Sequence, residues 1–350
     1  MRTRYARVSC AIALALGGCA PRDYAVTLKG FPSSHRGDRS SARDALFAAD
    51  ADLADSIARL GPIDGLLAAM RDDAIYLAEE IAILRGKDGI SALQKSDAAR
   101  SAPMISAALA GGDASADGRF GFTFGWLQAP SRAAGEARLN DATYVAAWTR
   151  DGASRPFRVA AYYTRASSGP HRPARDGFPL LVGGSGASGV PHPGDVEEQK
   201  QSLRRTDAEF AAYSVAHGYT LAFAAYAAEV TMPFGRSFVF LVGRREVLEF
   251  YKGWTPAEVL EWTPIFADAS GSGDLGYTAG TSVTTKNDPD GTVHRAYNKY
   301  LSIWARRADG SWKYVADGGA SAPAPSPGPY ISEGLSRVQT KPPKRPGAVE

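Results

Sequence analysis

Cysteine and histidine are both scarce in this sequence, and their positions exclude two kinds of chemistry. The only cysteines among the 350 residues are Cys10 and Cys19, so the chain beyond residue 19 can form neither a disulfide nor a cysteine nucleophile. The five histidines show no metal-ligand spacing. We therefore expect no bound metal.

A surplus of charge of one sign is also missing. The chain has 40 Lys and Arg against 37 Asp and Glu, but Arg2, Arg4 and Arg7 lie in an N-terminal segment that we expect to be removed. The remainder is formally neutral and lacks the basic balance of a nucleic-acid-binding protein. We expect no nucleic-acid partner.

The apolar run near the N-terminus is too short to cross a bilayer, which needs about 20 residues. Three arginines precede this run at residues 8–16, and small residues follow it. This pattern predicts a signal peptide over residues 1–18. The chain beyond it, residues 19–39, has the Gly, Pro and Ser content of a tether.

Residues 16–19 (LGGC) resemble the lipobox of bacterial lipoproteins. The resemblance implies that Cys19 carries the lipid that anchors the protein to a membrane. Ala20, in place of an aspartate, favours the outer membrane, so we expect the protein to face the periplasm. A plain signal peptide, in which Cys19 is incidental, is the alternative.

One glycine-rich segment has the spacing of a dinucleotide-binding motif. Residues 184–189 (GSGASG) match the spacing of the dinucleotide fingerprint, but Pro191 and Pro193 follow at once. No helix N-terminus can then receive a pyrophosphate. We expect no cofactor.

The rest of the chain contains an internal repeat with a period of about 156 residues. Motifs recur in the same order and spacing, as residues 50–54 and 207–211, 118–125 and 273–280, and 144–148 and 300–304. We infer two copies of one domain: copy one at residues 40–166 and copy two at residues 200–320. A Gly- and Pro-rich linker at 167–199 joins them, and a Pro-rich tail at 321–350, expected to be disordered, follows.

Each copy has the order helix, helix, strand pair, helix and strand meander. Leu46, Leu53 and Ile57, for example, lie on one face of the first helix, and Gly61-Pro62 ends it. This order predicts an α+β fold, with helices on one face of an antiparallel sheet.

Three segments of copy two resemble SnoaL-like domains of the nuclear transport factor two-like superfamily (family 4440 of the domains of unknown function). The segments are 242–247 (VGRREV), 272–278 (SGDLGYT) and 304–313 (WARRADGSWK), and copy one resembles the family more weakly. The resemblance implies two tandem cone-shaped domains of cystatin-like fold, each a curved sheet wrapped around helices and enclosing a pocket. It does not fix a function, because the superfamily contains both enzymes and binding modules.

Comparison of the copies suggests one catalytic pair. Where copy one has Ile57, Leu60 and Tyr162, copy two has Ser214, His217 and Asp317. A carboxylate that orients an imidazole can transfer protons, so His217 and Asp317 are candidate catalytic residues. The alternative is that His217 ends its helix in solvent and that Asp317 belongs to a turn.

Aromatic and neighbouring side chains are the candidate lining of a pocket. They are Ser214, Tyr226, Met232, Tyr277, Tyr300 and Trp304 of copy two and Tyr76, Phe124 and Trp148 of copy one. The same residues could equally fill a packed core.

These observations favour a lipid-anchored binding protein for a small apolar molecule or for a protein partner. The duplication suggests that the copies pair through the outer faces of their sheets, as an intrachain pseudo-dimer. An isomerase or dehydratase that uses acid–base catalysis in copy two is the alternative, and a purely structural envelope protein with filled cones is a third possibility.

Overall fold

A computed structural model describes residues 36–95, 105–128, 140–167, 189–253 and 258–325. The expected signal peptide, Cys19, residues 326–350 of the tail and most of the linker lie outside these residues. Among the described helices, none combines the length and the apolar character that a bilayer crossing requires.

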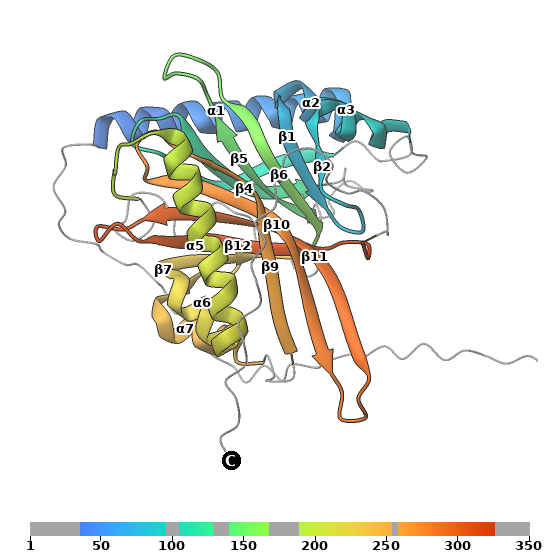
Figure 1. Cartoon of the computed structure of the whole chain (residues 1–350). Coiled ribbons are helices and arrows are strands. Elements are labelled where there is room, and N and C mark those ends of the chain that lie inside the picture. The colour runs from blue at the N-terminus through green and yellow to red at the C-terminus, as the bar shows by residue number, and fades with distance from the viewer. Residues whose placement is uncertain (1–35, 96–104, 129–139, 168–188, 254–257, 326–350) are drawn as a thin grey trace, which may run out of the picture. The chain divides into compact units, whose positions relative to one another are not determined.

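The described residues of copy one form three α-helices, a short 3-10 helix and one six-stranded sheet with the strand order β2-β1-β6-β5-β4-β3 (Figure 1). Its elements are α1 (Arg36–Leu60), α2 (Pro62–Ala69), β1 (Met70–Ala78), β2 (Leu84–Arg85), α3 (Gly86–Ser91), η1 (Ala92–Lys95), β3 (Ser106–Ala114), β4 (Phe120–Gln128), β5 (Asn140–Thr149) and β6 (Arg158–Ala166).

Copy two repeats this arrangement, with the equivalent strand order β8-β7-β12-β11-β10-β9. Its elements are α5 (Val196–His217), α6 (Tyr219–Tyr226), β7 (Ala227–Phe234), β8 (Leu241–Val242), α7 (Gly243–Tyr251), β9 (Glu258–Ala269), β10 (Leu275–Asn287), β11 (Val293–Arg306) and β12 (Trp312–Ser321). The α+β fold class is confirmed by these two sheets with their helices. The first helix of each copy begins four residues before the expected domain boundary.

The sheets differ from the expectation in one respect, because each is mixed rather than purely antiparallel. Strand β1 pairs in parallel with β6, and β7 pairs in parallel with β12. A helix and the strand meander separate the two partners along the chain, so no hairpin forces them to run in opposite directions.

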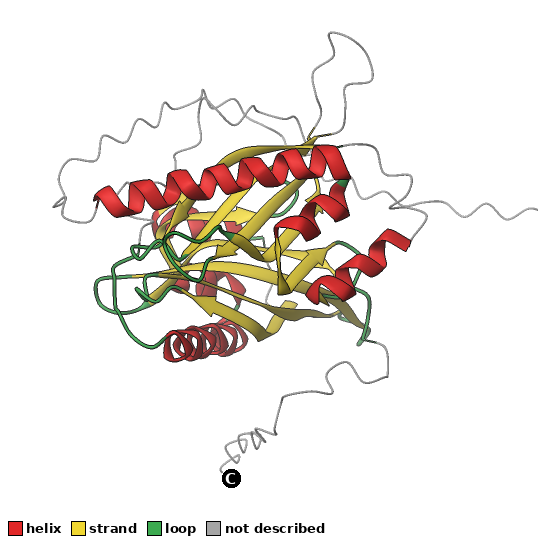
Figure 2. Ribbon diagram, turned by 90° about the horizontal axis from the view of Figure 1, so that it is seen from above, coloured by secondary structure: helices red, strands yellow, loops and turns green. Residues whose placement is uncertain are grey.

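Glycine ends the long helix of each copy at equivalent positions. Gly61 and Gly218 have φ values of +89° and +88°, a conformation that side chains rarely adopt. At the other end of α5, the Asp195 carboxylate accepts hydrogen bonds from the backbone N–H groups of Glu197 and Glu198. These local signals fix the helix that each sheet packs against (Figure 2).

One apolar cluster lies between each long helix and its own sheet. In copy one it includes Leu46, Leu53 and Trp148, and in copy two it includes Leu203 and Trp304, all of them buried. We call the space between the helices and the sheet the interior of a copy.

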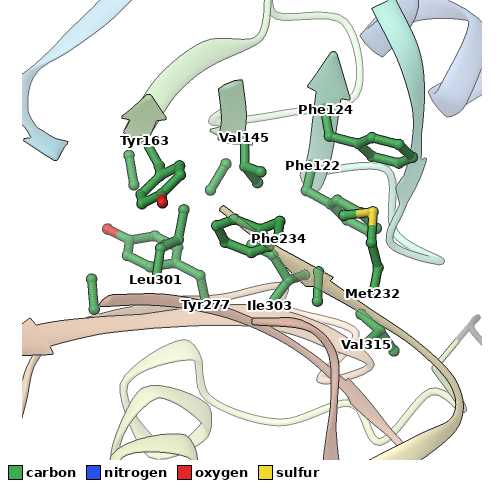
Figure 3. Close-up of a cluster of buried hydrophobic side chains, with 14 of the residues drawn as sticks. Phe122, Phe124, Val145, Tyr163, Met232, Phe234, Tyr277, Leu301, Ile303 and Val315 are labelled. Atoms are coloured by element: carbon green, nitrogen blue, oxygen red, sulfur yellow. The ribbon is translucent and has the colours of Figure 1, made fainter. Parts of the chain in front are cut away.

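A third apolar cluster joins the opposite faces of the two sheets. Figure 3 shows its side chains, which come from both copies. Phe124 of copy one meets Phe238 of copy two with ring centres 5.1 Å apart, and Tyr163 meets Phe234 at 4.9 Å. The two sheets therefore share one buried core, which we call the intersheet core.

Polar contacts around the intersheet core relate equivalent positions of the copies. The backbone N–H of Asp117 donates to Ser272 Oγ at 3.3 Å, and the backbone N–H of Ser272 donates to Asp117 Oδ2 at 3.0 Å. Such reciprocal bonds are the mark of an isologous contact. The symmetry breaks nearby, where Asp274 of copy two accepts a hydrogen bond from Arg39 of copy one at 2.7 Å.

Candidate functional site

A buried aspartate lies in the interior of copy one. Asp50 projects from α1 and is 2% exposed. Its carboxylate accepts hydrogen bonds from Tyr144 Oη at 2.8 Å and from Thr123 Oγ1 at 2.6 Å. Trp148 Nε1 donates to the same threonine hydroxyl at 2.8 Å, which completes a four-residue network.

Copy two carries the same network at equivalent positions. The Asp207 carboxylate accepts from Tyr300 Oη at 2.7 Å, and Trp304 Nε1 donates to Thr278 Oγ1 at 2.8 Å. Thr278 is also hydrogen-bonded to Asp207. Copy two adds one more donor, Trp262 Nε1, at 2.8 Å from Asp207.

Burial makes both carboxyls weak acids. It raises the pKa of Asp50 to about 6, although the hydrogen bonds from Thr123 and Tyr144 oppose the shift. Burial likewise raises the pKa of Asp207, against three such hydrogen bonds. The polar groups of each network form hydrogen bonds with one another. We therefore assign both networks to the structural framework that the two copies share.

The interiors differ beside this network. In copy one, three tyrosine rings stack: Tyr144 and Tyr162 have centres 5.7 Å apart, and Tyr162 and Tyr76 have centres 6.2 Å apart. The strand pairing places Pro233 and Asp317 of copy two where copy one has Tyr76 and Tyr162. Copy two therefore lacks two of the rings that fill copy one.

Asp317 occupies a strongly perturbed environment in copy two. Burial raises its pKa to about 7, the charge of Asp207 adds to the shift, and a hydrogen bond from Ser302 Oγ at 2.5 Å opposes it. Asp317 as a residue is half-buried, whereas the equivalent Tyr162 is buried.

Four tyrosines lie within electrostatic reach of Asp317. Burial raises the pKa of Tyr219, Tyr251, Tyr300 and Tyr314 well above the ordinary value. The negative charge of Asp317 adds to each shift, although for Tyr251 the neighbouring tyrosines, and for Tyr300 the charge of Asp207, contribute more. Tyr219 and Tyr251 are also hydrogen-bonded to each other. The interior of copy two thus combines two weakly acidic carboxyls with several hydroxyl donors.

The other expected member of the catalytic pair lies elsewhere. His217 is exposed at the last residue of α5, and its ring centre is 4.1 Å from that of Tyr213. Within the described part of the chain, no hydrogen bond or ion pair joins it to Asp317. The expected dyad is corrected here, because a histidine beside the helix-ending Gly218 faces solvent at the C-terminal dipole.

The expected lining residues divide between two environments. Six face the interior of their copy: Tyr76, Trp148, Ser214, Tyr226, Tyr300 and Trp304. Phe124, Met232 and Tyr277 instead belong to the intersheet core, so their expected place on an interior wall is corrected. Alternation along a strand sends neighbouring side chains to opposite faces, and Tyr277 thus lies opposite to Thr278.

Two open grooves are lined by residues of copy two. One, of about 370 Å³, lies between α5 and strands β9 and β10, with Trp262 in its wall. The other, of about 510 Å³, lies beside α7 and is lined by residues that include Leu241 and Phe250. Because Trp262 also bonds Asp207, the first groove is the one that borders the polar interior.

Asp50 and Asp207 were not among the residues that the sequence singled out. A signal for them exists, because each is an acid on the apolar face of a helix, and both recur in the repeat. Asp50 lies between Leu46 and Leu53, and Asp207 between Leu203 and Phe210. An acid held at such a position in both copies indicates a buried hydrogen-bonded group.

Comparison with known proteins yields structural similarity alone. No family model and no curated protein matches this sequence. An NTF2-like protein with a cystatin-like fold from Novosphingobium aromaticivorans is 17% identical over 36% of this chain and 82% of its own, with a TM-score of 0.31.

Two further structures are similar to a comparable extent. A ketosteroid isomerase-like protein from Erwinia carotovora is 16% identical over 35% of this chain and 96% of its own, with a TM-score of 0.30. The association domain of C. elegans CaMKII is 14% identical over 36% of this chain and 97% of its own, also with a TM-score of 0.30. At these identities the likeness concerns the fold alone.

Proposed function

We propose that copy two binds a small molecule in its interior beside Asp317, and that copy one is a filled structural partner. The observation that carries the proposal is the replacement of Tyr76 and Tyr162 by Pro233 and Asp317 at equivalent positions. A smaller ring and a carboxyl stand where copy one has two stacked aromatic rings. The shared networks of Asp50 and Asp207 support both copies alike.

The ligand would be a small apolar compound that carries a hydroxyl or a carbonyl group. Ligand sites commonly combine apolar and aromatic walls with a few well-placed polar groups. The apolar side chains of this interior include Phe210 and Phe223, and its polar groups include Asp317, Ser302 and several tyrosines. With a pKa of about 7, Asp317 can accept or donate a hydrogen bond near neutral pH.

Protein docking is the less favoured form of binding. The face of each sheet that could receive a partner is occupied by the other copy in the intersheet core. We propose that this pairing is an intrachain pseudo-dimer and that both copies belong to the SnoaL-like family. We also propose that Cys19 carries a lipid that anchors the protein to the outer membrane, with both copies in the periplasm.

Acid–base catalysis of the isomerase or dehydratase kind is a second candidate function. The observation that favours it is the pKa of Asp317 near 7, since a general base works best when its pKa lies near the operating pH. His217 has no part in this scheme.

Binding of 2-naphthol, a planar phenol, tests the ligand site. We expect saturation-transfer NMR to detect binding to the native chain, and we expect Asp317→Tyr, which restores the copy-one residue, to abolish it. Tyr76→Phe in copy one is the matched control and should leave binding unchanged. Equal binding by Asp317→Tyr and the native chain would refute the proposed site.

The lipid anchor has its own test. Intact-mass measurement of protein extracted from membranes should show a chain that begins at Cys19 with the added mass of acyl groups. Cys19→Ser should release the protein from the membrane fraction. A chain that keeps residues 1–18, or a membrane-bound Cys19→Ser variant, would refute the anchor.

A further inference from the structure

We propose that copy one positions Asp317 of copy two by clamping the backbone of β12 across the intersheet core, with Tyr163 and Arg165 as the positioning residues. The inference rests on the proposed function, because it concerns the same site. Asp317 is followed by two glycines, Gly318 and Gly319, and the clamp acts on the second of them.

The segment after Asp317 has no side chains of its own to hold it. Gly318 lies so close to β7 that a Cβ atom there would come within 2.2 Å of the Phe234 carbonyl oxygen. Glycine permits this close approach, but it also gives the backbone more freedom than any other residue. Pairing with β11 and β7 holds this backbone, and beyond that pairing the direction in which Asp317 projects depends on side-chain contacts made to the backbone around it.

Two side chains of copy one make such contacts at a single atom. Tyr163 Oη donates to the Gly319 carbonyl oxygen at 2.8 Å, and Arg165 Nη1 donates to the same oxygen at 2.7 Å. Arg165 is held in turn by Glu79, whose Oε1 lies 3.0 Å from Arg165 Nε. That carboxylate oxygen also lies 3.0 Å from Arg236 of copy two, so the clamp is tied to both copies.

A second contact lies two residues further along β12. The backbone N–H of Glu80 donates to the Ser321 carbonyl oxygen at 3.1 Å, and Ser321 Oγ donates to Glu80 Oε1 at 2.5 Å. Glu80 is the only described non-glycine residue with a positive φ, +61°. A strained conformation of this kind persists where surrounding contacts determine it, and here those contacts are made to β12.

The clamp acts in one direction. The strand pairing makes Gly318 the equivalent of Tyr163 and Gly319 the equivalent of Thr164. Because Gly318 stands where copy one has Tyr163, copy two has no hydroxyl at this position that could bond to β6. Copy one thus holds the strand that bears Asp317, whereas its own equivalent strand bears the packed Tyr162.

The titratable groups within electrostatic reach of Asp317 come from several elements. In the interior of copy two they are Asp207 of α5, Tyr219 of α6, Tyr251 of α7, Tyr300 of β11 and Tyr314 of β12, and across the sheet, in the intersheet core, Tyr163 of β6. Burial is the main cause of the raised pKa of Tyr163, and the negative charge of Asp317 adds a smaller part, which places the clamp within electrostatic reach of the carboxyl.

The test compares Tyr163→Phe with Tyr162→Phe in the full chain. Both variants lose one hydroxyl, but Tyr162 faces the interior of copy one, and in the described part of the chain no hydrogen bond joins it to β12. We measure the titration of the Asp317 carboxyl by ¹³C NMR and the affinity for 2-naphthol. For Tyr163→Phe we expect the titration midpoint to fall by about 1 pH unit as water reaches a less constrained Asp317, and affinity to fall about tenfold.

We expect Tyr162→Phe to leave both readouts unchanged. Arg165→Met is a second variant that removes the other donor and should move the midpoint in the same direction. If the native chain binds 2-naphthol while both clamp variants keep its affinity and its Asp317 titration, the positioning role is refuted and the proposed function stands. If the native chain does not bind the probe but the clamp variants still move the titration, the positioning role stands and the proposed function fails.

Discussion

The two interiors of this chain share one hydrogen-bonded network but differ in the side chains packed around it. Each interior contains a buried aspartate, Asp50 or Asp207, that is hydrogen-bonded to a tyrosine and a threonine. A tryptophan indole donates to the hydroxyl of that threonine. Beside that network copy one stacks Tyr162 on its neighbours, whereas copy two has Asp317. Under the proposed function, this difference assigns two tasks: copy one keeps a structural core, and copy two holds the carboxyl that binds the ligand.

The largest effect is expected from exchanging the residue that distinguishes the copies. Tyr162→Asp would remove a ring packed against Tyr76 and Tyr144 and place a carboxylate in a site with no donor arranged for it. We expect a loss of about 4 kcal/mol in the free energy of unfolding. Chemical denaturation measures it, and a loss below about 1 kcal/mol would show that the interior of copy one is not solid.

The shared networks give the next largest effect. Asp50→Ala and Asp207→Ala each leave buried hydroxyl donors without an acceptor, so we expect each to cost about 3 kcal/mol of stability. Chemical denaturation at pH 5 gives the loss in the free energy of unfolding for each variant, and the ratio of the two losses shows whether the copies share this framework. Nearly equal losses are expected of a common framework, and a loss confined to one copy would contradict it.

The pH dependence of stability should carry the signature of Asp317. Its pKa rises on folding from 3.8 to about 7, so the folded state binds more protons than the unfolded state between these values, and stability falls as pH rises through them. Asp317→Asn should therefore stabilise the protein at pH 8 by about 2 kcal/mol and leave it nearly unchanged at pH 4.

Thermal denaturation across pH 4–8 checks this expectation. Some decline with pH should survive in Asp317→Asn, because the pKa of Asp50 is also raised, to about 6. An Asp317→Asn variant with the full decline of the native chain would show that Asp317 is not the group responsible.

The smallest effect concerns the intersheet core, where Thr143 and Lys299 are equivalent residues. Thr143 Oγ1 donates to the Gly235 carbonyl at 2.5 Å, and Lys299 Nζ donates to the Ile81 carbonyl at 2.7 Å, each reaching into the other copy. Burial lowers the pKa of Lys299 to about 8, so the folded state binds fewer protons above that pH, and stability rises between about pH 8 and 10.5.

Lys299→Met should remove this rise, whereas Thr143→Val should keep it and cost about 1 kcal/mol at every pH. Denaturation at pH 7.5 and 10 separates the two variants. An unchanged rise in Lys299→Met would place its origin in another group.

Much of the fold could be predicted from the sequence because it follows from local patterns and from the repeat. The spacing of Leu46, Leu53 and Ile57 indicated the long helix and its inward face, and Gly61-Pro62 marked its end. The parallel pairing of β1 with β6 could not be predicted, since it depends on how a long connection folds back rather than on any residue within it.

The site was predicted only in part. Asp317 was singled out because the repeat aligns it with Tyr162, and the structure shows that burial raises its pKa. His217 was misplaced because spacing along a helix does not say where the sheet beneath it ends. The clamp of Tyr163 and Arg165 on Gly319 was invisible to sequence, since it joins residues more than 150 positions apart at a backbone atom.

The most direct test of the difference between the copies is a ¹³C NMR titration of the aspartate carboxyls with and without 2-naphthol. Asp317 should titrate near pH 7 and shift when the probe is added, while Asp50 should titrate near pH 6 and stay unmoved. A probe that shifts Asp50, or that shifts neither carboxyl, would contradict a solid copy one beside a ligand-binding copy two.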